Sequence, residues 1–118
     1  MKAASWKRKI ESACRDAGTY RPYFDATIRT LAEIMERRDE AAEEYQRTGG
    51  RPIGKYTNKG GATNPTKNPA LVLWNDLNTT ALAYWRDLGL TPAGLKKIDD
   101  SAMKPQKRSA LSEVLREL

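Results

Sequence analysis

Residues 68–93 read NPALVLWNDLNTTALAYWRDLGLTPA, and this stretch specifies both ends of one helix. Asn68 can act as the N-cap, because its side-chain oxygen can accept a hydrogen bond from an early helical N–H. Pro69 suits the first helical position, since no backbone N–H donor is needed there. The pattern predicts a helix over 69–88 with a defined beginning.

The other end of this helix is marked by a glycine. Gly89 favours the left-handed conformation that ends a helix, and Leu90 is expected to fold back on Tyr84 or Trp85. Thr91, followed by Pro92, then caps a new short helix. The chain is therefore expected to turn sharply after residue 88.

Apolar residues cover a broad arc of the 69–88 helix, more than one stripe. A helix of this kind must be buried on two sides. One side can pack antiparallel on an earlier helix, and the other needs a further partner, most simply a second copy of the chain. The apolar positions are Leu71, Trp74, Leu77, Ala81, Tyr84, Trp85 and Leu88.

The earlier helix is predicted over residues 22–48, beginning at Pro22 or Asp25. A coiled-coil-like seam runs along it, with Arg38 at its one polar place. The segment is net acidic, which favours protein rather than phosphate as its neighbour. Packing within one chain and packing between subunits both remain open. The seam consists of Phe24, Ile28, Leu31, Met35, Ala42 and Tyr45, and the predicted oligomer interface of Ile28, Leu31, Met35, Trp74, Leu77, Tyr84 and Trp85.

Two segments are strongly basic. Residues 2–17 predict an amphipathic helix that ends at Gly18, with an apolar stripe of Trp6, Ile10, Ala13, Cys14 and Ala17. Residues 49–67 contain four bases and no acid, and 53–57 suits a short strand of a hairpin turning at 58–61. The helix is either a solvated face or a DNA contact, and the loop either a connector or a DNA contact. The DNA-binding candidates are Lys2, Lys7, Arg8, Lys9 and Arg15 first, and Arg51, Lys55 and Lys59 second.

The overall composition agrees with a polyanion as partner. The chain has 118 residues, a net charge of +6 and a sequence pI of about 9.6. It has no histidine and one cysteine, so we expect no metal, no cofactor and no catalysis. The longest apolar run, 70–74, is too short to span a bilayer, and a reducing cytoplasm is expected.

The C-terminal part divides into a linker and a short helix. Residues 96–108 carry five bases and little apolar surface, which predicts a linker. After it, apolar residues at helical spacing predict a helix that is too short to be stable alone. It either docks on a partner protein or packs back on its own domain. We predict partner binding through Leu111, Val114, Leu115 and Leu118, and an organisation of 1–21 (basic helix), 22–98 (helical hairpin core) and 99–118 (linker and partner-binding helix).

Taken together, these motifs resemble the small terminase subunits of tailed bacteriophages, in the branch called the P27 family. The resemblance runs from about residue 6 to 98 and rests on four motifs. They are the Gly-Thr-Tyr turn at 18–20, the glycine-rich basic loop at 49–61, the Lys-Asn-Pro-Ala-Leu start at 67–71 and the Leu-Gly-Leu-Thr-Pro-Ala-Gly-Leu-Lys-Lys close at 88–97.

The residues predict an all-α fold, a helical hairpin with a possible short β-hairpin in its loop. The resemblance implies a ring-forming oligomer without enzymatic activity. Such a protein binds double-stranded viral DNA at the packaging site in the host bacterial cytoplasm. It recruits and regulates the large terminase subunit, which holds the ATPase and the nuclease. Two alternatives stay open on the residues alone: a helical transcriptional regulator that binds DNA as a dimer, and a protein adaptor with no role on DNA.

Overall fold

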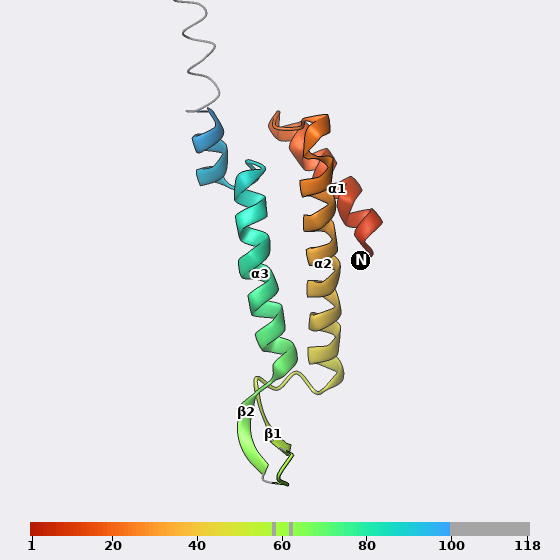
Figure 1. The fold of residues 1–118 in the computed structure, drawn as a ribbon, viewed down its shortest axis with the longest axis vertical. Helices are drawn as coiled ribbons and strands as arrows, with labels where there is room; N and C mark the ends of the chain where they lie inside the picture. Colours follow the sequence, from red (N-terminus) through yellow and green to blue (C-terminus); the bar gives the residue numbers. More distant parts are fainter. Residues whose placement is uncertain (58, 62, 100–118) are drawn as a thin grey trace, which may run out of the picture.

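The computed structural model describes residues 1–57, 59–61 and 63–99. Two long antiparallel helices form a rod, a shorter helix lies against one of them, and a β-hairpin projects from one end (Figure 1). A further helical segment at 92–99 follows the second long helix. The elements are α1 (Ala3–Ala17), a 3₁₀ turn (Pro22–Phe24), α2 (Asp25–Arg47), β1 (Ile53–Thr57), β2 (Thr63–Lys67) and α3 (Pro69–Asp87).

The predicted end of α1 and the predicted start of α3 are confirmed, and local capping chemistry sets both. Gly18 has a φ of 75° and ends α1, and the N–H of Thr19 donates to the carbonyl of Cys14 at 2.8 Å. At the start of α3, the Asn68 side chain accepts a hydrogen bond from the N–H of Ala70 at 3.0 Å. α2 spans 23 residues and is therefore about 35 Å long.

The end of α3 also forms as expected. Gly89 has a φ of 72°, and the N–H of Leu90 donates to the carbonyl of Trp85 at 2.9 Å. The Thr91 hydroxyl then accepts from the N–H of Gly94 at 3.0 Å and caps the next helix. That helix continues to residue 99, so residues 96–99, expected to be linker, are helical. The remainder of the expected linker, 100–108, lies outside the described residues.

α2 lies at the centre of the fold, with α1 and α3 packed on it (Figure 1). α1 runs antiparallel to α2 and contacts it between Asp25 and Asp39. The last two turns of α2 lie beyond these contacts and pack against α3. The core is a single cluster to which all three helices contribute. Its largest fully buried side chains are Ile10, Cys14, Ile28, Leu31 and Leu88.

A two-stranded antiparallel sheet joins α2 to α3, and the fold is therefore mainly helical rather than all-α. The predicted strand at 53–57 is confirmed as β1, and its partner β2 pairs Lys67 with Ile53 and Pro65 with Lys55. Proline is tolerated in β2 because a two-stranded sheet has an open edge on each strand. Within the described ranges, no helix is both long and apolar enough to cross a membrane.

Candidate nucleic-acid and subunit interfaces

Three of the five basic residues proposed on α1 are engaged within the chain. Lys7 Nζ lies 2.8 Å from an Asp25 carboxylate oxygen, and the hydrogen bond from Lys7 lowers the pKa of Asp25. Lys9 Nζ lies 5.1 Å from the centroid of the Trp6 indole, and the Arg15 guanidinium lies 4.0 Å from that of the Tyr20 ring. Lys7 thus joins α1 to α2, Arg15 packs on the turn that follows α1, and the Lys9 contact lies within α1 itself.

The other two basic residues, Lys2 at the N-cap of α1 and Arg8 within it, are exposed and contact neither an aromatic ring nor an acid within ion-pair distance among the described residues. Arg8 donates to the Ser5 hydroxyl at 3.3 Å. Lys2 lines a small cleft of about 110 Å³ together with acidic side chains of α2. A phosphate approaching Lys2 would meet these carboxylates as well, which weakens its attraction. The acidic residues of the cleft are Glu36, Asp39, Glu40 and Glu43.

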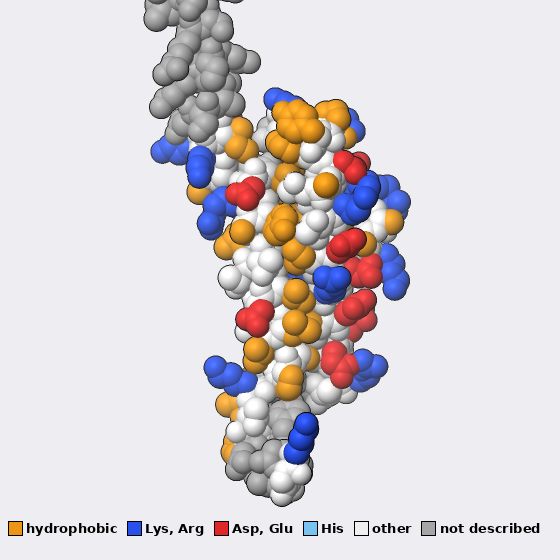
Figure 2. All heavy atoms as spheres, viewed as in Figure 1, with side chains coloured by type: hydrophobic (Ala, Val, Ile, Leu, Met, Phe, Trp, Pro, Cys, Tyr) orange, Lys and Arg blue, Asp and Glu red, His pale blue; other side chains and the backbone are white. Residues whose placement is uncertain are grey.

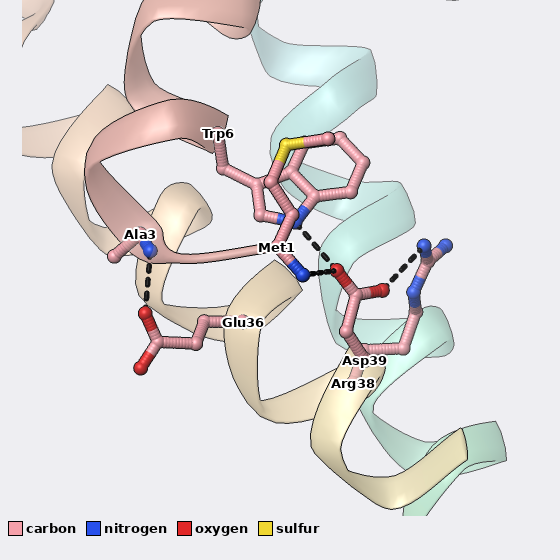
Figure 3. Close-up of polar contacts among 6 residues, drawn as sticks. All are labelled: Met1, Ala3, Trp6, Glu36, Arg38 and Asp39. Atoms are coloured by element: carbon pink, nitrogen blue, oxygen red, sulfur yellow. Dashed lines mark hydrogen bonds and ion pairs between the residues drawn. The ribbon is translucent and has the colours of Figure 1, made fainter. Parts of the chain in front are cut away.

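The junction between α1 and α2 centres on Asp39 (Figure 3). One oxygen of its carboxylate accepts from Trp6 Nε1 at 2.7 Å and from the Met1 amino group at 3.2 Å, and the other accepts from Arg38 at 3.0 Å. Burial by itself would raise the pKa of Asp39, but these hydrogen bonds outweigh it and lower the pKa. Nearby, the N–H of Ala3 donates to the Glu36 carboxylate. The junction is a structural clamp between the helices.

Arg38, the polar residue in the predicted seam, connects all three helices. Besides Asp39 it contacts Asn78 of α3, at 3.4 Å, and its guanidinium lies 5.6 Å from the centroid of the Trp6 ring of α1. The sequence signal for this role was its place among apolar neighbours. Its contacts were not predictable, because they depend on how α1 and α3 approach α2.

The basic side chains of the hairpin segment, unlike Lys7 of α1, are not paired with acidic residues of the described chain. Arg51, Lys55, Lys59 and Lys67 are all exposed, and within the described part of the chain none of them forms an ion pair. No acidic residue occurs in the segment 49–67. On the face drawn in Figure 2, the acidic side chains lie over the helices rather than over the hairpin. The hairpin segment therefore presents basic side chains that form no ion pair with any carboxylate of the described residues.

The pairing register adds Lys67 to the predicted basic set. Lys67 lies opposite Ile53, and Lys55 lies two residues further along β1, opposite Pro65. Residues directly opposite one another project from the same face of a sheet, and so do residues two apart along one strand. Lys55 and Lys67 therefore share one face. The absence of acidic residues around Lys67 in the sequence could have marked it as a candidate for DNA binding. That it shares a face with Lys55 depends on the strand register, which the sequence does not give.

The base of the hairpin is held to both long helices by Asn68, which is 3% exposed. Its amide nitrogen donates to the Thr48 hydroxyl at 3.2 Å and to the Arg51 carbonyl at 3.1 Å, while its amide oxygen caps α3. Its backbone N–H donates to the carbonyl of Pro52 at 2.8 Å. One side chain thus ties the end of α2, the start of the hairpin and the start of α3 together.

Two grooves flank the seam between α2 and α3, in the half that α1 does not cover. The first measures about 500 Å³ and is lined by the apolar Ala41, Pro69, Ala70, Leu73 and Leu77 and by the charged Arg37, Glu40, Glu44 and Arg47. The second measures about 260 Å³ and is lined by Ala42, Tyr45, Gln46, Leu71 and Trp74. On α2 the two sets of lining residues lie roughly half a turn apart, so the grooves open on opposite sides of the seam.

The residues predicted for the oligomer interface fall into two groups. Ile28, Leu31 and Met35 are at most 2% exposed and lie in the core of a single chain, so they are unavailable to a neighbouring copy in this conformation. The four residues on α3 remain half-buried: Trp74, Leu77, Tyr84 and Trp85.

Exposed apolar residues of α3 were missing from the predicted interface. Val72 is 39% exposed, Leu73 is 50% exposed and Leu82 is 45% exposed. Figure 2 shows a band of hydrophobic side chains along the seam between α2 and α3. Val72 and Leu73 belong to the apolar run 70–74, but none of the three residues was assigned to the predicted arc. Which apolar residues of α3 stay uncovered depends on how the helices pack.

Within the ranges that the structure describes, no group of three or more His, Cys, Asp or Glu side chains could hold a metal ion.

The predicted partner-binding residues Leu111, Val114, Leu115 and Leu118 lie outside the described residues.

Comparison with known proteins identifies the family. The family described as phage terminase, small subunit, matches residues 3–112, which include α1, α2, α3 and the hairpin. No curated protein and no solved structure matches the chain. The resemblance seen in the sequence is confirmed at the level of this family. The chain therefore belongs to the phage terminase small subunits.

Proposed function

We propose that this chain assembles into a ring, binds viral DNA at the packaging site, and recruits and regulates the large terminase subunit. Its family has a role in phage DNA packaging, which takes place in the host cytoplasm, and the small subunits are generally non-catalytic regulators. Chemistry on DNA then belongs to the large subunit. The branch within the family that the sequence suggests remains a prediction.

The observation that carries this proposal is the pair of different grooves on opposite sides of the α2–α3 seam. The side of one copy that carries the first groove could contact the side of the next copy that carries the second groove. Such a contact would be heterologous, because the two copies contribute different surfaces. Such contacts generate closed rings when the rotation between copies closes. The exposed Leu73 and Leu82 supply apolar surface that this contact would remove from water.

Assembly also supports DNA binding by a modestly charged subunit. Side-by-side packing would repeat every basic segment around the ring. A weak electrostatic contact in each copy would then contribute through avidity. Repetition of one basic surface suits the regular phosphate backbone of duplex DNA.

Recruitment of the large subunit is proposed to use the apolar residues of segment 109–118. Deleting this segment should abolish recruitment and leave assembly and DNA binding intact. Pull-down of the purified large subunit by the full-length and truncated chains measures the first effect. Equal recruitment by both would refute this assignment.

The test of the ring compares two matched substitutions on α3 by native mass spectrometry. Leu73→Glu places a charge in the first groove at a half-exposed position, where folding as a single chain should tolerate it. Thr79→Glu places the same charge at an exposed position that lines neither groove. We expect a ring-sized assembly for the wild type and for Thr79→Glu, and monomers for Leu73→Glu. A wild type that is monomeric or dimeric, or a Leu73→Glu variant that still assembles, would contradict the proposal.

A further inference from the structure

We infer that the β1–β2 hairpin, rather than the basic helix α1, is the principal DNA contact, and that it lies as a two-stranded ribbon in the major groove. This inference rests on the proposed function, because it presupposes that the protein binds DNA. It specifies which element makes the contact and which surface of the duplex is contacted.

The first argument is the state of the charges. On α1, Lys7 is paired with Asp25, Lys9 and Arg15 lie over aromatic rings, and Lys2 shares a cleft with acidic residues. Moving these cations to phosphate would require breaking or weakening those contacts. The basic side chains of segment 49–67 are exposed, and among the described residues none of them forms an ion pair with an acidic side chain. The free-energy cost of breaking existing contacts before binding phosphate is therefore lower at the hairpin than at α1.

The second argument is shape. The hairpin projects beyond the end of the helical rod (Figure 1), so a duplex can approach it without meeting the acidic surface of α2. Neighbouring strands lie about 4.8 Å apart, and side chains extend beyond them. The major groove of B-DNA, about 12 Å wide, admits such a ribbon, whereas the minor groove, about 6 Å wide, does not. Lys55 and Lys67 share one face and can reach the duplex together.

The third argument is the bracing of the hairpin base. A simple connector between two helices needs no fixed direction. Here Asn68 bonds to Thr48 and to the Arg51 carbonyl, and the Tyr45 hydroxyl donates to the carbonyl of Gly50 at 2.7 Å. The hairpin is therefore oriented along the rod (Figure 1), although Ile53, Lys55 and Lys67 on its strands are exposed. A protein element that enters a groove of DNA needs such a fixed orientation.

The test removes the same charge from two places in the full-length protein. Lys55→Ala/Lys67→Ala takes two cations from the hairpin, and Lys2→Ala/Arg8→Ala takes two from α1. Binding to a duplex that contains the packaging site is measured by fluorescence anisotropy over a range of salt concentrations. We expect the hairpin variant to bind at least about tenfold more weakly, with a salt slope shallower by about one for each lysine removed per engaged subunit. The α1 variant should stay within about threefold of the wild type.

Methylation interference on the same duplex tests the groove. Methylation of the major-groove nitrogen of guanine should block binding, whereas methylation of the minor-groove nitrogen of adenine should not. Interference confined to the minor groove, or an α1 variant weakened as much as the hairpin variant, would overturn the inference while the proposed function stood. A wild type that binds no DNA at low salt would overturn both. Native mass spectrometry of each variant confirms that assembly is unchanged.

Discussion

Replacing Asn68 with alanine should loosen the hairpin and weaken the start of α3 at the same time. Loss of the N-cap bond to Ala70 costs about 1 kcal/mol, and each of the two amide donor bonds, to Thr48 and to the Arg51 carbonyl, contributes about 1 kcal/mol. Because these bonds share one side chain, their sum is not strictly additive. We expect the free energy of unfolding to fall by roughly 2–4 kcal/mol.

Two further substitutions separate the two roles of Asn68. Asn68→Ser keeps an oxygen that can cap α3 but loses the amide, so its loss should be intermediate, roughly 2 kcal/mol. Asn75→Ala changes an exposed asparagine within α3 and should alter stability by at most about 0.5 kcal/mol. The two asparagines thus contrast a buried junction with an exposed helix surface.

Urea unfolding followed by circular dichroism measures these differences, at one protomer concentration because assembly adds to apparent stability. For a domain of this size, 2–4 kcal/mol corresponds to a fall in Tm of roughly 10–20 °C. An alanine variant within about 0.5 kcal/mol of the wild type would refute the reasoning. In that case the hairpin base would be held by contacts other than those of Asn68.

Three more predictions follow from single contacts. Gly94→Ala should lower stability by about 1–3 kcal/mol in thermal unfolding, because its Cβ would lie 2.2 Å from the Arg86 carbonyl oxygen; an unchanged Tm would contradict this packing. The pKa of Asp39 is lowered in the fold, so its contribution to stability is complete above about pH 4, the range of an unfolded aspartate, and is lost as pH falls through the lower folded pKa. Urea unfolding from pH 7 to 2 should therefore show a smaller acid-induced loss for Asp39→Asn than for the wild type, and equal losses would exclude this role. Cys14 is fully buried and burial raises the pKa of its thiol, so alkylation by iodoacetamide should be slow in the native protein and fast in denaturant; fast native alkylation would show that α1 detaches readily.

Local features of the fold were predictable from the sequence because their causes lie within a few residues. The Asn-Pro start of α3, the left-handed glycines at 18 and 89, and the strand at 53–57 all formed as expected. Caps and turns involve backbone groups no more than about five positions apart, so residue order alone specifies them. The acid-free charge of segment 49–67 is likewise a property of the sequence.

Features that depend on contacts between distant segments could not be read in this way. Periodicity predicted an apolar seam on α2 and a broad apolar arc on α3, but not that Ile28 and Leu31 would be covered by the chain itself while Leu73 stayed half-exposed. It also could not show that Lys7 would meet Asp25, since that pair depends on the packing of α1 on α2. A helix presents its side chains at fixed angles, but its crossing angle and register with a neighbour decide which of them are buried and which cations remain available to a partner.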